Sequence, residues 1–270
     1  MTSPSVANEL PVSQASELLI EQVGPVITLT LNRPTRRNAL SESLVAALIA
    51  AQERIREQTD CHVVILKAAG QVFCSGHDLG EMTGRKESEY AHLFEQCSRM
   101  MFGWRQLPQP VIAGVQGMAT GAGCQLASAC DLVIATPAAQ FATPGVKLGL
   151  FCSTPMVPLV RSIPPKIAME MLLTGVPLTA DRAMQFGLVN RIVAAGELDA
   201  ELTRWAETIA AASPLTLSIG KRAFYSQPML EEQAAYQQAS DTMTRNAICH
   251  DAQEGMQAFL AKRPPQWKGQ

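Results

Sequence analysis

A glycine-rich turn between a buried strand and a helix constrains this chain more than any other feature. Residues 111–115 are apolar, and Gly117, Gly121 and Gly123 follow before a stretch of small residues that ends at Asp131. Glycine allows the backbone to turn tightly and to approach a ligand closely. The free N–H groups and the positive dipole end of the following helix would face this turn. We therefore expect the turn to stabilise negative charge, either a phosphate or the oxyanion that forms when a carbonyl becomes an enolate.

The patterning of the rest of the chain predicts an α/β fold. Residues 26–31 alternate as a strand, and Ser41 is expected to cap the helix that follows. Further strands at 62–67, 110–115 and 131–135 adjoin helical patterns, so the connections are crossovers and the sheet is mostly parallel. From about residue 164 the pattern is helical, with one short strand at 188–193; the helices are expected at 165–174, 179–186, 197–212, 214–226, 230–248 and 251–262.

Composition excludes several classes of protein. The chain has 270 residues, 47% of them apolar, and a net charge of −2, which gives no signal for a nucleic-acid partner. No apolar run reaches the roughly 18 residues that cross a bilayer. The seven cysteines are scattered and the four histidines are dispersed, which favours reduced thiols in a cytoplasmic protein without a metal site. We expect a disordered tail at 1–16, a core at 17–195 and a helical C-terminal region at 196–270.

A second segment, 72–79 (Val-Phe-Cys-Ser-Gly-His-Asp-Leu), has the same character as the glycine turn and follows the strand at 62–67. Further ordered motifs are Leu31-Asn32-Arg33-Pro34, Asn38-Ala39-Leu40, Phe141-Ala142-Thr143-Pro144-Gly145, and Glu254-Gly255-Met256 with Phe259 and Lys262-Arg263. Over about residues 17–268, this set resembles the enoyl-CoA hydratase/isomerase (crotonase) superfamily. It looks closest to the enoyl-CoA hydratase domain-containing subgroup, which lacks the standard catalytic glutamates. The resemblance implies a spiral ββα core, a helical trimerisation region and a CoA-thioester ligand.

The resemblance also implies roles for particular residues. The backbone N–H groups of His77 and Ala122 would form an oxyanion hole for the thioester oxygen. The two glutamates of a typical hydratase fall at Gln125 and Gly145. Glutamine cannot exchange a proton near neutral pH and glycine has no side chain, so hydration by the two-glutamate route is not expected. Restoring both glutamates should raise hydration if the scaffold positions them.

Other residues could replace the missing acid and base. Cys152 and Ser153 begin the next helix, where a cysteine can have a lowered pKa and act as a nucleophile. However, no histidine is adjacent in sequence, which favours a small buried apolar cysteine at this position. The imidazole of His77 could turn toward the site, and His92 lies in the helical stretch 88–106 that often lines the acyl pocket in relatives, although a surface or core role fits both.

On the CoA side, relatives use a basic loop, apolar backbone contacts and a lysine near the C-terminus. The matching residues here are Arg33, Arg36, Arg37, Ser75, His77, Leu79 and Lys262. No cofactor is expected beyond the CoA moiety of the substrate. The C-terminal helices imply a homotrimer or a dimer of trimers. Two readings stay open: an acyl-CoA enzyme of crotonase type acting on an unidentified thioester, and a non-catalytic or weakly catalytic acyl-CoA-binding protein.

Overall fold

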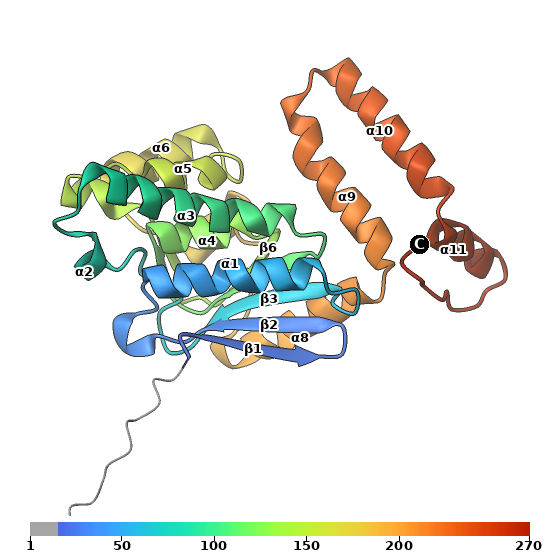
Figure 1. Cartoon of the computed structure of the whole chain (residues 1–270), viewed down its shortest axis with the longest axis horizontal. Helices are drawn as coiled ribbons and strands as arrows, with labels where there is room; N and C mark the ends of the chain where they lie inside the picture. The colour runs from blue at the N-terminus through green and yellow to red at the C-terminus, as the bar shows by residue number, and fades with distance from the viewer. Residues whose placement is uncertain (1–15) are drawn as a thin grey trace, which may run out of the picture.

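A twisted sheet with helices on both faces forms the body of the molecule (Figure 1). The computed structural model describes residues 16–270, so the predicted tail at 1–16 lies outside the described residues except for Ser16. Within this range the main sheet has six strands: β1 (Leu18–Val23), β2 (Val26–Leu31), β3 (Val63–Ala68), β4 (Val111–Val115), β6 (Leu132–Ala135) and β9 (Arg191–Ile192), in that spatial order. Strand β1 pairs antiparallel with β2 and the other pairs are parallel, which confirms the predicted α/β class.

A second, smaller sheet was not expected from the sequence. It contains β5 (Met118–Thr120), β7 (Gln140–Ala142) and β8 (Leu178–Thr179). Single bridges connect Cys74 with Ala119 and Leu40 with His77. These short pairings hold the segment 72–79 beside the glycine-rich turn, so the two motifs predicted to work together are adjacent in space.

Helices make up most of the remaining chain. They are α1 (Glu42–Arg56), α2 (Leu79–Met82), α3 (Glu87–Gln106), α4 (Ala122–Ala129), α5 (Ser153–Leu159), α6 (Pro165–Thr174), α7 (Ala180–Gln185), α8 (Leu198–Ala210), α9 (Pro214–Ser226), α10 (Glu232–Ala247) and α11 (His250–Leu260). Local chemistry explains several of their ends. The Ser41 hydroxyl accepts from the Leu44 N–H at 3.2 Å, and Gly175 ends α6 in the left-handed conformation.

Successive residues of β3 serve two different cores, as the period of a strand requires. Val64 and Leu66 belong to the large core beneath α1, α3 and α4, whereas Val63 and Ile65 pack in a smaller cluster with Leu202 of α8. Figure 1 shows α8 on the opposite side of the sheet from α1, α3 and α4. Helix α8 therefore packs against the sheet, whereas α9, α10 and α11 follow it outside this layer.

The predicted strand at 188–193 is shorter in the structure, where only Arg191 and Ile192 pair with β6. The N–H of Leu188 instead donates to the carbonyl of Ala183 at the end of α7. The chain at Leu188 therefore completes a turn after the helix and joins the sheet later. No helix in the part of the chain that the structure describes is both long enough and apolar enough to cross a membrane.

A buried polar cluster ties α9 to the core. The carboxylate of Asp131 accepts from the Lys221 ammonium at 2.6 Å, from the Tyr225 hydroxyl at 2.8 Å and from the Val111 N–H at 2.7 Å. Burial lowers the pKa of Lys221, although the Asp131 charge opposes that shift. Asp131 therefore has a structural role, because it joins α9 to the start of β4.

Helices α9, α10 and α11 extend away from the sheet as a separate arm (Figure 1). Neither α9 nor α10 contains a buried residue. Large apolar side chains lie exposed along the arm, among them Phe224, Tyr236, Met243, Ile248 and Phe259. An apolar surface of this extent on a soluble monomer is unusual and is typical of a protein interface.

Candidate functional site

The two glycine motifs and the start of α5 surround one cavity of about 360 Å³, which we call the turn cavity. Its walls are mainly apolar, and they bring together residues from four separate segments of the chain. The lining residues are Ser75, Gly76, His77, Leu79, Met82, Phe94, Thr120, Gly121, Ala122, Pro144, Gly145, Leu148, Leu150, Phe151, Cys152, Ser153, Thr154 and Pro155. The predicted site residues His77, Ala122, Gly145, Cys152 and Ser153 therefore line one cavity, whereas Gln125 does not.

Two backbone N–H groups from different turns are free at this cavity. Within residues 16–270, no protein acceptor takes a hydrogen bond from the N–H of His77 or of Ala122. Gly76 has φ +95° and Gly121 has φ +54°, conformations that favour glycine, and each precedes one of these donors. A Cβ atom on Gly76 would lie 3.5 Å from the Ala122 nitrogen, so the turns are in contact. The pair can act as an oxyanion hole.

Helix α4 begins at Ala122 and all eight of its residues are buried. Its N-terminus therefore faces the turn cavity, where the helix dipole adds positive potential to that of the two free N–H groups. The cavity favours a ligand oxygen that gains negative charge, such as a polarised carbonyl.

The space beside Gly145 is already occupied. A Cβ atom added there would lie 2.6 Å from the Leu150 carbonyl oxygen and 2.8 Å from the Cys152 sulfur. Gly145 is buried in the short turn Pro144–Leu148, and Leu150 donates its N–H back to the Gly145 carbonyl at 2.9 Å. The loop has closed over the position where a larger residue would project.

The Cys152 thiol does not have the activated character suggested by its place at a helix start. Cys152 is the residue before the first turn of α5, as predicted, but burial raises its pKa, and a backbone hydrogen bond with Gly145 only partly opposes this. At neutral pH the thiol is protonated and is a poor nucleophile. The expectation of a lowered pKa at Cys152 is therefore wrong, because desolvation outweighs the helix terminus.

Gln125 lies on α4 but lines a different cavity from the turn cavity. Its side chain is buried, and in the described part of the chain the amide oxygen has no hydrogen-bond partner. Thr154 lines both cavities, so Gln125 is a neighbour of the turn cavity rather than part of its wall.

Neither histidine singled out from the sequence has a hydrogen-bond partner among the described residues that would activate it. The imidazole of His77 packs edge-on against Phe94 with ring centroids 5.8 Å apart, and burial lowers its pKa. The ring is therefore neutral at physiological pH. His92 is exposed and lies beside Gln96 and Glu42 at another hollow, so it does not line the site as its helix position had suggested.

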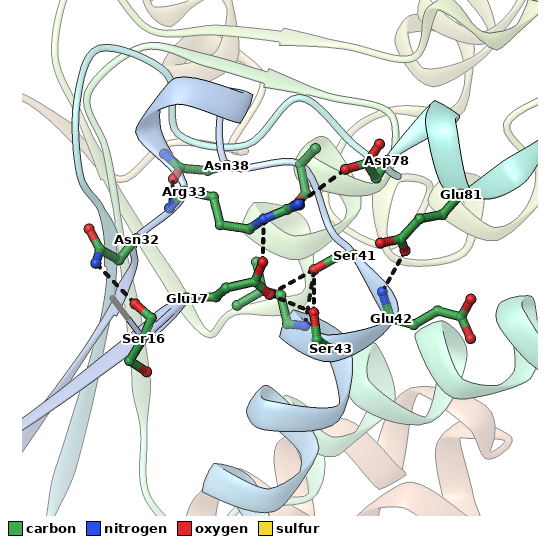
Figure 2. Close-up of polar contacts among 12 residues, drawn as sticks. Ser16, Glu17, Asn32, Arg33, Asn38, Ser41, Glu42, Ser43, Asp78 and Glu81 are labelled. Carbon is green, nitrogen blue, oxygen red and sulfur yellow. Dashed lines mark hydrogen bonds and ion pairs between the residues drawn. The ribbon is translucent and has the colours of Figure 1, made fainter. Parts of the chain in front are cut away.

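Arg33 is engaged within the protein rather than free for a phosphate (Figure 2). Its guanidinium contacts the carboxylate of Glu17 at 2.7 Å and that of Asp78 at 3.2 Å, with only 12% of the side chain exposed. Asp78 also accepts from the Gly80 N–H at 3.1 Å and so caps α2. Arg33 therefore positions the segment that carries His77, whereas its predicted contact with CoA stays a prediction.

The remaining predicted CoA contacts divide into two groups. Ser75 and Leu79 line the turn cavity. Arg36 and Arg37 are exposed in the adjoining loop, where the Arg37 carbonyl accepts from the Ser75 N–H at 3.1 Å. Lys262 follows α11, which Figure 1 places at the opposite end of the molecule from α2.

Sequence reasoning missed the apolar rim of the turn cavity. Leu148, Leu150 and Phe151 line it while 60%, 49% and 44% exposed. The sequence shows that these three apolar residues lie in one short segment. Their exposure, which makes them a rim, is known only from the structure. The rim suits an apolar ligand portion near the oxyanion turn.

Comparison with known proteins gives the family. Residues 21–270 match the family model described as enoyl-CoA hydratase/isomerase. The chain is 42% identical over 258 residues to "Enoyl-CoA hydratase domain-containing protein 3, mitochondrial" from Rattus norvegicus. The matched region covers 95% of this chain and 86% of the rat protein. It is 34% identical to the 2,3-dehydroadipyl-CoA hydratase of Escherichia coli, over 94% of this chain and 99% of that protein.

Solved structures agree. An enoyl-CoA hydratase from Mycobacterium smegmatis superposes with a TM-score of 0.91 at 45% identity, covering 94% of this chain and 99% of the other. The human enoyl-CoA hydratase domain-containing protein 3 superposes with the same TM-score at 42% identity, covering 93% of this chain and 100% of the other. The chain therefore belongs to the enoyl-CoA hydratase/isomerase family, the crotonase superfamily. Within it, the chain falls with the enoyl-CoA hydratase domain-containing subgroup, as its motifs had indicated.

The predicted cytoplasmic location is wrong on this comparison. The proteins of the same subgroup from rat, mouse and human are all named as mitochondrial. Scattered reduced cysteines are compatible with either compartment, so cysteine usage could not distinguish them.

Proposed function

We propose that this protein binds acyl-CoA or enoyl-CoA thioesters, with the thioester oxygen accepting hydrogen bonds from the N–H groups of His77 and Ala122. The observation that carries the proposal is the pair of free donors at one cavity, at the N-terminus of α4. Preorganised donors of this kind stabilise an enolate oxygen more than a ground-state carbonyl. The E. coli relative, named as a hydratase of a CoA thioester, supports the ligand class.

The proposal excludes hydration by two glutamates. Such a reaction needs two carboxylates that hold and activate one water. Gln125 and Gly145 stand at the positions that the resemblance assigns to them, and none of the residues lining the turn cavity is acidic. The titratable side chains in that lining are His77, whose pKa is lowered, and Cys152, whose pKa is raised. Neither is poised to exchange a proton near neutral pH.

That observation favours weak or absent catalysis over an efficient enzyme of the same family. A neutral imidazole could still accept a proton, but the nitrogens of His77 are buried and have no partner among the described residues. We therefore infer that binding of a thioester, rather than its rapid conversion, is the main capability of this site.

A library of acyl-CoA and enoyl-CoA thioesters incubated with the protein and followed by mass spectrometry tests this proposal. We expect several thioesters to bind in calorimetry, and none to be consumed faster than about 1 per second, the lower end of usual enzyme turnover. Free CoA serves as the control for contacts with the nucleotide alone. Absence of binding by every thioester would contradict the proposal, and rapid turnover of one of them would establish the enzyme reading instead.

We also propose that the protein is a homotrimer or a dimer of trimers. Exposed apolar side chains of α10 and α11, such as Tyr236, Met243 and Phe259, are covered by no other part of residues 16–270. Lys262 and the turn cavity lie at opposite ends of the molecule, so only another subunit could bring a lysine of this segment to a CoA bound there.

In light scattering at micromolar concentration we expect a mass of three or six times the 29.1 kDa of one chain. Replacing Phe259 and Ile248, which are 83% and 76% exposed, with aspartate should shift the mass toward the monomer, because it places charge in an apolar interface. Glu207→Asp in α8, outside the arm, is the matched control. A monomeric mass for the native protein would refute this assignment.

A further inference from the structure

Three hollows share lining residues in succession, beginning with the turn cavity. Thr154 lines both the turn cavity and a second cavity of about 190 Å³, which we call the middle cavity. Phe102 and Arg105 in turn line both the middle cavity and a third cleft of about 780 Å³, which we call the arginine cleft. An acyl chain that extended from the oxyanion turn past Thr154 and Phe102 would reach Arg105.

The middle cavity is mostly apolar. Its walls include Met101, Phe102, Ala129, Val157 and Pro158. Gln125 contributes a neutral amide, where a carboxylate would repel an anion entering this space. The cavity thus suits a methylene chain, and its charge does not oppose an acidic end group.

The arginine cleft has the opposite character. Arg56, Arg105, Arg161 and Arg222 line it, and none of its lining residues is acidic. Within residues 16–270 none of these four guanidinium groups forms an ion pair with a carboxylate. The Asp131 carboxylate, which accepts from the Tyr225 hydroxyl beside this cleft, is already engaged by Lys221 as well.

Arg105 is held in place at the junction. Its guanidinium lies over the ring of Tyr225, 5.0 Å from the centroid, and the Tyr225 hydroxyl is fixed by Asp131. Stacking on an aromatic ring leaves the edge of a guanidinium available for a bidentate carboxylate. The junction between the apolar path and the charged cleft therefore carries a positioned anion receptor.

We propose that the preferred ligand is a CoA thioester whose acyl chain ends in a second carboxylate, bound by Arg105 and the arginine cleft. This inference rests on the proposed function, because the thioester end must occupy the turn cavity. A plain acyl chain would bring a methyl group to four guanidinium groups and would satisfy none of them. A distal carboxylate replaces water at Arg105 with a charge-assisted pair, and sites built for a polar group discriminate strongly against ligands that lack it.

Calorimetry with pairs of thioesters of equal chain length tests the inference: adipyl-CoA against hexanoyl-CoA, and suberyl-CoA against octanoyl-CoA. In the native protein we expect the dicarboxylic member of at least one pair to bind about tenfold more tightly, as a charged hydrogen bond provides. Arg105→Gln should abolish the difference while hexanoyl-CoA still binds. Arg99→Gln is the matched control on the same helix, because Arg99 is 59% exposed and pairs with Glu53 outside these cavities.

The outcomes separate the two proposals. Equal affinity within both pairs would overturn this inference and leave thioester binding intact. Failure of all four thioesters to bind would overturn the proposed function and this inference with it. A preference that survives in Arg105→Gln, and in Arg222→Gln as a second variant should the first not fold, would remove the arginine cleft as its cause.

Discussion

We expect hydration of crotonyl-CoA by the purified protein to be very slow or undetectable, because each missing acid or base typically contributes about 10²–10⁴ in rate. A water in the turn cavity would have no base to deprotonate it and no acid to protonate the α-carbon. The free N–H groups of His77 and Ala122 would still stabilise the enolate oxygen. We therefore expect thioester binding without rapid hydration.

The loss of absorbance of the conjugated thioester gives the rate, and mass spectrometry of 3-hydroxybutyryl-CoA identifies the product. A heat-inactivated sample corrects for hydration by the buffer. Turnover in the ordinary range of about 1–10³ per second by the native protein would show that the two glutamates are dispensable here.

The structure changes the expectation for restoring the glutamates. From the sequence, Gln125→Glu with Gly145→Glu should raise hydration. However, a Cβ atom at Gly145 would meet the Leu150 carbonyl oxygen at 2.6 Å, and backbone cannot move aside as a flexible side chain does. We therefore expect Gly145→Glu to displace the loop around Leu150 and to leave hydration low, with or without the change at Gln125.

The second large effect concerns the oxyanion turn. In Ala122→Pro we expect acyl-CoA affinity to fall by up to about tenfold, the worth of one lost hydrogen bond. Any turnover found in the thioester library should fall by about 10²–10³, as when an oxyanion donor is removed. Ala122 is the first residue of α4, a position where proline is well tolerated because no intrahelical bond uses its N–H. The substitution removes the donor while it leaves the helix.

Glu87→Pro provides the control, since Glu87 is the first residue of α3, is exposed and lies outside the turn cavity. Circular dichroism checks that both variants fold. If folded Ala122→Pro bound acyl-CoA as tightly as Glu87→Pro, the thioester oxygen would not be at this turn.

Much of the fold follows from local pattern. The alternation of residues 26–31, the cap at Ser41 and the helical periods after residue 164 predicted elements that the structure confirms. These features depend on neighbours within a few residues along the chain, so they can be read from the sequence. The short strands β5, β7 and β8 could not, because two or three residues carry no period and their pairing comes from distant segments.

The features of the site also divide into local ones and ones that depend on tertiary contacts. The sequence contains the glycine turns, and its resemblance to the family predicts donors at His77 and Ala122 and places Gln125 and Gly145 at the glutamate positions. Only the tertiary structure decided that Arg33 is held by Glu17 and Asp78, that the Cys152 pKa is raised, and that Gln125 and Arg105 line the same cavity. The physical reason is that backbone geometry is set locally, whereas burial, charge pairing and cavities depend on side chains that meet from remote parts of the chain.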